Sequence, residues 1–268
     1  MPRVFRWSVL LLFLAITLIP FLWLINASFK SSAELFANPF GLTSSFSLEN
    51  YFSSFAVHPL HIYFRNSVIV AVLSTLLALT ASVLAAYALL HRFRLSRPAF
   101  VFLIFGLFLP VNAFIVPIFF IIHSIGLYNT WWGLILVYAG ISLPLSFLII
   151  KTYMDTIPRE LLEAAHMDGA SYHRTFFSVI LPMTMPGIVT GAIFLMITAW
   201  NELLFASLLT QDETARTVQV GIRFFLTTYS ANYPQAFAAT VMTIVPTILM
   251  YVFLSNRVIA GMTAGALK

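Results

Sequence analysis

Cysteine is missing from this chain of 268 residues, so disulfide bridges, thiolate metal ligands and cysteine nucleophiles are all excluded. Charge is scarce as well. Asp, Glu, Lys and Arg together make up 9% of the residues, whereas soluble domains carry about 25%. Hydrophobic residues account for 60% of the chain. This balance predicts an integral membrane protein with no separate soluble catalytic domain.

The sequence also lacks the common signatures of catalysis and phosphate binding. No GxxxxGK run followed by Ser or Thr is present, so the chain has no phosphate-binding loop of the Walker type. No GxSxG run or carboxylate pair near a cleft indicates hydrolysis. The 6 histidines are scattered and none lies in an HExxH pattern, so we expect no metal site. We therefore do not expect an enzyme.

Six apolar runs that are long enough to cross a membrane follow one another along the chain. They cover residues 7–29, 67–90, 99–122, 131–150, 187–209 and 236–254. Runs of about 20 residues match a hydrocarbon core of about 30 Å. The sequence thus predicts an all-α integral membrane protein with six transmembrane helices. We divide it into a first span with an external loop (1–66), a five-span core (67–255) and a tail (256–268).

The distribution of positive charge predicts the orientation of these spans. Ten of the 14 Lys and Arg residues would lie on one side, and the other side would hold four: Lys30, Arg65, Arg216 and Arg223. Loops rich in Lys and Arg stay in the cytoplasm. We therefore expect both termini in the cytoplasm and the loops 30–65 and 211–235 outside. These loops also explain the net charge of +5 without nucleic acid as a partner.

The segment 151–186, between the fourth and fifth apolar runs, is far more polar than its neighbours. It holds four of the 9 acidic residues and three basic ones: Asp155, Glu160, Glu163, Asp168, Lys151, Arg159 and Arg174. Each charge costs about 2.5–3.5 kcal/mol at the centre of a membrane helix, so the segment lies outside the hydrocarbon, on the cytoplasmic side. Acid and base are nearly balanced, which argues against a DNA-binding helix-turn-helix.

Local signals in this segment predict two short helices joined by a turn. Pro158 suits the first turn of a helix, and Gly169 ends that helix by adopting the left-handed conformation. Ser171 is placed to cap a second helix. Pro182 and Pro186 should then break the second helix before the fifth span. Composition alone leaves open whether this helical hairpin is a plain amphipathic connector or binds a partner.

Several short motifs carry a resemblance to a known family. The run Glu163-Ala164-Ala165, followed by Asp168-Gly169-Ala170, resembles the EAA loop of ATP-binding-cassette importer permeases that depend on a solute-binding protein. Further motifs, along nearly the whole chain, resemble the carbohydrate-uptake or maltose-type branch: Asn66-Ser67, Ala85-Ala86-Tyr87-Ala88, Gly126-Leu127-Tyr128-Asn129-Thr130, Trp200-Asn201-Glu202 and Gly261-Met262-Thr263-Ala264-Gly265-Ala266. The resemblance implies the type I (MetI-like) permease fold with cytoplasmic EAA coupling helices.

In that family the two helices of the EAA loop seat in a groove of an ATPase subunit. The resemblance therefore implies that five residues couple this chain to an ATPase: Glu163, Ala164, Ala165, Asp168 and Gly169. It also implies a second, non-identical permease, two ATPase subunits, an extracytoplasmic solute-binding protein and a sugar as partners, in the lipid of a prokaryotic inner membrane. ATP and magnesium would be bound by the ATPase, so this chain would hold no cofactor.

Three polar residues within or beside the spans are candidates for the translocation pathway: Asn112, Asn201 and Glu202. An ionisable group at membrane depth faces protein or water rather than lipid, which favours a functional role for Glu202. The alternative is an interfacial residue that serves helix packing. Asn112 follows Pro110, where a kinked helix would expose carbonyl groups and an amide would suit sugar hydroxyls. Packing is the alternative reading for Asn112 too.

These observations predict a permease that moves a sugar by alternating access and is driven by a separate ATPase. An importer permease for glycerol phosphate or a peptide is the first alternative, but a phosphate would favour basic residues mid-span and none is found there. A stand-alone carrier is the second, although such carriers usually show an internal repeat and charges near the midplane. The resemblance further implies that the tail 261–268 reaches the ATPases and that the loop 211–235 probes the binding protein.

Overall fold

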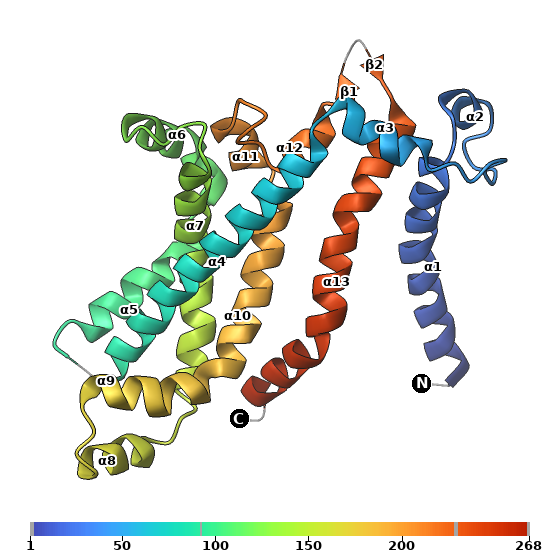
Figure 1. The fold of residues 1–268 in the computed structure, drawn as a ribbon. Helices are drawn as coiled ribbons and strands as arrows, with labels where there is room; N and C mark the ends of the chain where they lie inside the picture. Colours follow the sequence, from blue (N-terminus) through green and yellow to red (C-terminus); the bar gives the residue numbers. More distant parts are fainter. Residues whose placement is uncertain (1–2, 92, 228–229, 267–268) are drawn as a thin grey trace. The chain divides into compact units, whose positions relative to one another are not determined.

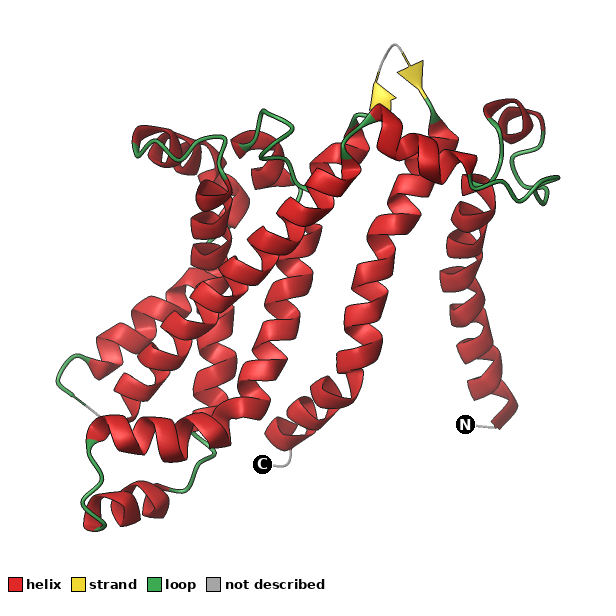
Figure 2. Ribbon diagram, viewed as in Figure 1, coloured by secondary structure: helices red, strands yellow, loops and turns green. Residues whose placement is uncertain are grey.

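The computed structural model describes the backbone of residues 3–91, 93–227 and 230–266. Within these ranges, the side chains of residues 226–227, 230–231, 250 and 253–266 lie outside the description. Helices make up almost all of the regular structure (Figures 1 and 2). One short antiparallel pair joins β1 (Leu226–Thr227) to β2 (Ser230–Ala231), with Leu226 opposite Ala231. The prediction of an all-α membrane protein is confirmed.

The chain divides into two compact units. Unit 1 comprises Met1–Phe64 and Thr217–Pro246, and unit 2 comprises Arg65–Arg216 and Thr247–Lys268. The division drawn from the sequence, at residues 66 and 255, cuts the chain into consecutive pieces. Each unit of the structure instead combines two stretches that are distant in sequence, because packing rather than chain order defines a compact body.

Unit 1 combines the N-terminal helices with helices from the stretch Thr217–Pro246. It contains α1 (Arg3–Ser28), α2 (Ser32–Ala37), α3 (Glu49–Val57), α12 (Val218–Arg223) and the first part of α13 (Tyr233–Ala266). The ring of Trp23 on α1 lies 5.5 Å from the ring of Phe237 on α13. The amide of Gln235 donates a hydrogen bond of 2.8 Å to the hydroxyl of Ser53 on α3. The region 30–65, expected to be a polar loop, therefore contains two short helices and the start of α4, with apolar side chains such as Phe40 and Leu42 exposed.

Unit 2 contains the remaining helices. They are most of α4 (Leu60–Leu90), α5 (Ser96–Phe105), the 3-10 turns η1 (Gly106–Phe108) and η2 (Val111–Phe114), α6 (Ile115–Ser124), α7 (Trp131–Met154), α8 (Arg159–Met167), α9 (Tyr172–Thr175), the π turn η3 (Phe176–Ile180), α10 (Leu181–Asn201) and α11 (Leu204–Leu209). The core is formed mainly by α4, α7 and α10, with Phe147 and Ile150 fully buried. Close packing depends on small residues, since a side-chain carbon at Gly187 would lie 2.5 Å from Cγ of Tyr153.

Four helices are long and apolar enough to cross a membrane among the described residues. They are Val4–Ser28, Leu60–Leu90, Trp131–Met154 and Tyr172–Asn201. A bent pair, Ser96–Phe108 with Val111–Ser124, adds a fifth span if its two parts are counted together. The described part of the last predicted run is an apolar helix, Tyr233–Leu249, that is shorter than a span. The structure thus supports four or five spans, and the sixth stays a prediction.

The third predicted span, 99–122, is not a single helix. It bends by 90° at the break between Phe108 and Val111. Pro110 causes the break, because it has no N–H for a helical hydrogen bond and forces the preceding residue out of the helical region. Leu109 accordingly has an extended backbone, with ψ at 128°.

The predicted break at Pro182 and Pro186 is wrong, because α9, η3 and α10 form one continuous helical rod, Tyr172–Asn201. Pro186 lies inside α10, and a π turn explains the difference at Pro182. The N–H of Leu181 bonds to the carbonyl of Phe176, five residues back, so the turn is wider just before Pro182. The wider turn removes the clash between a proline ring and the carbonyl four residues earlier. The expected fifth span, 187–209, also ends early, at Asn201.

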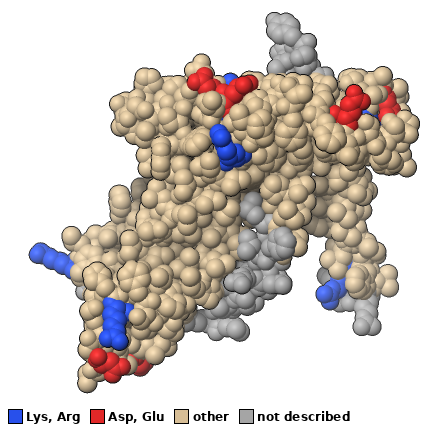
Figure 3. All heavy atoms as spheres, viewed as in Figure 1, with Lys and Arg blue, Asp and Glu red and all other residues tan. Residues whose placement is uncertain are grey.

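Charge and hydrophobicity are distributed as a membrane environment requires. Figure 3 shows Lys, Arg, Asp and Glu in small groups, with wide uncharged surface between them. None of the 18-residue apolar window of α1 is buried, and Leu12 and Phe13 are among its exposed side chains. Apolar surface of this extent suits lipid or a partner subunit rather than water.

Candidate functional site

The turn between α8 and α9 is a compact Schellman motif. The N–H of Gly169 bonds to the carbonyl of His166 at 3.0 Å, and the N–H of Ala170 bonds to the carbonyl of Ala165 at 2.9 Å. Gly169 has φ of +71°, as the sequence predicts for a residue just past a helix end. Ser171 then caps α9 by accepting a hydrogen bond from the N–H of Arg174 at 3.3 Å. The hairpin predicted from the sequence is therefore formed.

Exposure separates the five predicted coupling residues into two groups. Glu163, Ala164, Asp168 and Gly169 are exposed on the hairpin surface. Ala165 is 8% exposed and lies inside. Pro158 also differs slightly from expectation, because it is the N-cap residue and α8 begins at Arg159. The predicted coupling residues that are exposed are therefore acidic (Glu163, Asp168) or small (Ala164, Gly169). Exposed His166, His173 and Arg174 lie close to the turn, and Met167 adds an apolar side chain that is 88% exposed.

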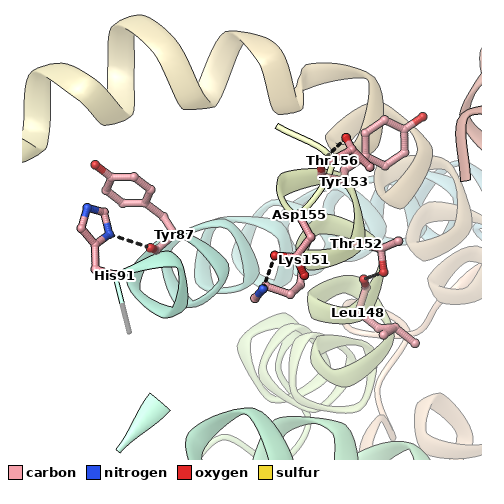
Figure 4. Close-up of polar contacts among 8 residues, drawn as sticks. All are labelled: Tyr87, His91, Leu148, Lys151, Thr152, Tyr153, Asp155 and Thr156. Carbon is pink, nitrogen blue, oxygen red and sulfur yellow. Dashed lines mark hydrogen bonds and ion pairs between the residues drawn. The ribbon is translucent and has the colours of Figure 1, made fainter. Parts of the chain in front are cut away.

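The hairpin leaves α7 through a short polar stretch. At the end of α7, Lys151 forms an ion pair with Asp155 one turn later, and Thr152 donates to the carbonyl of Leu148 at 2.8 Å (Figure 4). Thr156 donates to the carbonyl of Tyr153 at 2.7 Å, which closes the last turn. These local bonds satisfy polar groups where the chain leaves the apolar bundle.

Glu202 lies at the opposite end of α10, directly after Asn201. Its Oε1 accepts hydrogen bonds from the N–H groups of Leu204 and Phe205, at 2.7 and 2.9 Å. Its Oε2 accepts from the N–H of Ala206 at 3.0 Å and from the phenol of Tyr138 at 2.6 Å. The carboxylate thus closes the first turn of α11 and ties the break between α10 and α11 to α7.

The other two predicted pathway residues are separate from this arrangement. Asn201 is exposed, and its amide donates to the carbonyl of Ile197 at 2.8 Å, within its own helix. Asn112 is exposed in η2, at the bend of the third span. Its neighbours Val111 and Phe114 line an apolar hollow of about 420 Å³ against α7. Asn201 and Glu202 are therefore close only because they are adjacent in the chain, and Asn112 lies on a different element.

Two residues that the sequence did not mark as functional hold the loop after α11. Asn66 lies inside α4 rather than at its start, and its amide donates to the carbonyls of Thr214 and Arg216 at 2.9 and 2.8 Å. The indole N–H of Trp131, the first residue of α7, also donates to the carbonyl of Thr214, at 3.2 Å. For Asn66, the available signal was its place in the Asn66-Ser67 motif, as a polar side chain in an apolar run.

Asn129 is the third anchor of the same loop. Its side-chain oxygen accepts from the N–H groups of Gln211 and Asp212 at 2.8 and 3.0 Å, and its amide donates to the carboxylate of Asp212. The backbone of Asn129 is left-handed, with φ of 59°, a conformation that Asn tolerates better than most residues. The Gly-Leu-Tyr-Asn-Thr motif therefore has a structural role that its resemblance alone did not reveal.

No group of three or more His, Asp or Glu residues suitable for a metal ion is found in the part of the chain that the structure describes.

Comparisons with known proteins agree with these features. The family model described as binding-protein-dependent transport system inner membrane component matches residues 78–256. The sulfoquinovosyl glycerol transport system permease protein SmoH of Agrobacterium fabrum is 37% identical over 257 residues, covering 94% of this chain and 89% of SmoH. The trehalose/maltose transport system permease protein MalG of Thermococcus litoralis is 36% identical over 260 residues, covering 94% and 92%.

A solved structure shows the same fold. A chain of a bacterial ABC transporter that imports the acidic polysaccharide alginate matches with a TM-score of 0.83 at 22% identity, covering 94% of this chain and 95% of that one. The resemblance predicted from the short motifs and the MetI-like permease fold that it implied are therefore confirmed. Because the family model covers most of the chain and the relatives match nearly all of it, the chain belongs to the binding-protein-dependent transport inner membrane family and is a multi-pass, inner-membrane permease of an ABC importer.

Proposed function

We propose that this permease imports a sugar, together with a second, non-identical permease, two ATPase subunits and an extracytoplasmic binding protein. The names of its relatives support a carbohydrate substrate: they transport sulfoquinovosyl glycerol, trehalose or maltose and, at 34% identity, diacetylchitobiose. Glycerol phosphate and peptides remain the alternative solutes, and a stand-alone carrier is the weaker rival.

The exposed hairpin is the observation that carries the proposal. Glu163, Ala164, Asp168 and Gly169 would meet the ATPase directly, and Ala165 would support that surface from within. The Schellman turn fixes the angle between α8 and α9, so a force on the turn is not lost in loop motion. Because α9, η3 and α10 form one continuous rod, displacement of the hairpin passes directly into a membrane span.

Transport would follow alternating access. ATP and magnesium, held by the ATPases, would close the ATPase pair and draw the hairpins together, and the spans would open outward to accept solute from the binding protein. This chain contributes no covalent step. In the pathway, Asn112 and Asn201 would offer amides to sugar hydroxyls. Glu202 would act mainly through its position, since its four acceptor sites are already in use.

The charge pattern supports placing the hairpin and both termini in the cytoplasm, in a prokaryotic cell. The tail 256–268 would then lie near the ATPases, although its side chains fall outside the described residues. The loop 211–235 would face the binding protein.

Reconstitution tests the proposal. The permease, co-expressed with its partner subunits, should purify as a stable complex with an ATPase chain and take up a sugar into proteoliposomes only with ATP and the binding protein. A thermal-shift screen of saccharides against the binding protein would identify the substrate. Uptake by the lone chain, or a binding protein stabilised only by peptides or phosphate esters, would overturn it.

A further inference from the structure

Four rings gather where the hairpin meets the end of α4. This Tyr87 cluster consists of Tyr87 and His91 on α4, Tyr172 at the start of α9, and Phe176 in η3. The ring of Tyr87 lies 4.6 Å from that of Tyr172 and 4.8 Å from that of Phe176. The ring of His91 lies 4.8 Å from that of Tyr172, and its Nδ1 is 3.3 Å from the carbonyl oxygen of Tyr87 (Figure 4).

One hydrogen bond in the cluster joins α4 directly to the hairpin backbone. The phenol of Tyr87 donates to the carbonyl of Tyr172 at 2.8 Å. That carbonyl also accepts the N–H of Phe176, so both of its lone pairs are in use. Tyr87 is 2% exposed, and a donor so buried has no water to replace its acceptor.

Between this cluster and the middle of the span, a hollow separates part of the facing surfaces of the two helices. An apolar hollow of about 470 Å³ lies between them, lined by Leu76, Val83 and Leu84 of α4 and by Phe177, Leu181 and Met185 of the rod. The helices also touch beside the hollow, because a side-chain carbon at Gly191 would lie 3.2 Å from Cδ2 of Leu79, which lines the hollow. At the hairpin end, the Tyr87 cluster attaches α4 to the rod by a hydrogen bond as well as by ring contacts.

We propose that Tyr87 is a positioning residue that makes α4 move together with the hairpin. This inference rests on the proposed coupling role of the hairpin and adds the second route by which its motion enters the bundle. The rod carries the motion into α10 through continuous backbone. The hydrogen bond and ring contacts of Tyr87 carry it into α4.

Tyr87→Phe tests the proposal, because it keeps the ring and removes only the hydrogen bond. In the reconstituted complex, sugar uptake per ATP hydrolysed should fall about fivefold, the loss expected for one hydrogen bond, while ATP hydrolysis continues. Tyr172→Phe is the matched control: it keeps the ring and the backbone carbonyl, so its uptake per ATP should equal that of the parent. An unchanged ratio in Tyr87→Phe, or an equal fall in both variants, would overturn the proposal.

A distance measurement keeps the test independent of any loss of assembly in Tyr87→Phe. Spin labels on Leu84→Cys in α4 and His173→Cys in α9 meet no background from this chain, since it has no cysteine. With Tyr87 intact, their separation should stay the same between the nucleotide-free and the ATP-trapped complex. A change with Tyr87 intact would show that α4 and the hairpin move separately.

Gly169→Val separates this inference from the function on which it rests. If Gly169→Val uncouples transport and Tyr87→Phe does not, the hairpin couples but Tyr87 does not carry its motion. If neither variant affects coupling, the role of the hairpin itself is refuted.

Discussion

The phenol of Tyr138 on α7 donates a hydrogen bond of 2.6 Å to the carboxylate of Glu202, at the break between α10 and α11. Tyr138 is 3% exposed, so this bond is shielded from water. Three N–H groups of α11 occupy the remaining acceptor positions of the carboxylate. The acidic residue that the sequence offered for the pathway therefore also determines where a span ends and how the next helix begins.

Substitution of Glu202 should destabilise the complex more than substitution of its phenol partner. Glu202→Gln leaves an N–H or the Tyr138 hydroxyl without an acceptor, which costs about 1–3 kcal/mol. Tyr138→Phe removes only the donor and should cost about 1 kcal/mol. Thermal unfolding of the purified complex measures both. Asn201→Ala is the control, since its amide bonds only within α10.

A different outcome for Glu202→Gln would assign Glu202 to solute binding rather than to helix packing. If Glu202→Gln leaves thermal stability unchanged but raises the sugar concentration needed for half-maximal uptake, the carboxylate contacts solute directly.

Asn129 should be hard to replace, because it supplies both a left-handed backbone and three hydrogen bonds to the loop that begins at Gln211. Asn129→Gly keeps the backbone and loses the bonds, whereas Asn129→Val also strains a residue with φ of 59°. We expect protease cleavage in the loop 211–216 to rise in both variants, more strongly in Asn129→Val. Equal cleavage in both variants and the parent would show that Asn66 and Trp131 hold the loop without Asn129.

Gly169→Val should uncouple ATP hydrolysis from uptake. No neighbour lies within 4 Å of a side-chain carbon at this position, so the penalty comes from φ of +71° alone and amounts to about 1–2 kcal/mol or more. Uptake and ATPase rates measured on the same proteoliposomes give the coupling ratio. Gly140→Val is the control: its surroundings are equally open and its backbone is helical. Full coupling in Gly169→Val would refute a role for the turn.

Cysteine labelling tests the orientation, with no background from a native cysteine in this chain. A membrane-impermeant maleimide should label Asp212→Cys in intact cells, because that exposed loop is predicted to face outward. Ser171→Cys, in the hairpin, should react only after the membrane is permeabilised. The reverse labelling pattern would show that the predicted topology is inverted, with the hairpin outside the cell, where it could not contact a cytoplasmic ATPase.

The loop between α1 and α3 should loosen in acid. The N–H of Ser44, 2.6 Å from Oε1 of Glu34, lowers the pKa of this carboxyl below its usual 4.5, and Lys30 lowers it further. Because the folded pKa is depressed, the stabilisation is present above the unfolded pKa and is lost as pH falls through the folded pKa. A fluorophore on Leu42→Cys should therefore gain mobility below the usual pKa. In Glu34→Gln that pH dependence should disappear, and its persistence would implicate another group.

The sequence by itself determined the features that depend on local chemistry. Scarce charge and long apolar runs were sufficient to predict a helical membrane protein, since each charge in lipid is costly. Within the hairpin, Gly169 and Ser171 were correctly placed because turn and cap preferences depend on a few adjacent residues. The EAA motif gave the family for the same reason, as its residues are contiguous.

Only the tertiary structure decided which distant residues meet. Tyr87 and Tyr172, Tyr138 and Glu202, and Asn129 and Asp212 are each far apart in the chain, and no periodicity pairs them. The prolines show the same dependence. Pro110 bends its span by 90°, where the sequence predicted a kink, whereas the break predicted at Pro182 is avoided by a π turn. A proline removes the same hydrogen bond in each case, and the surrounding packing determines how the backbone compensates.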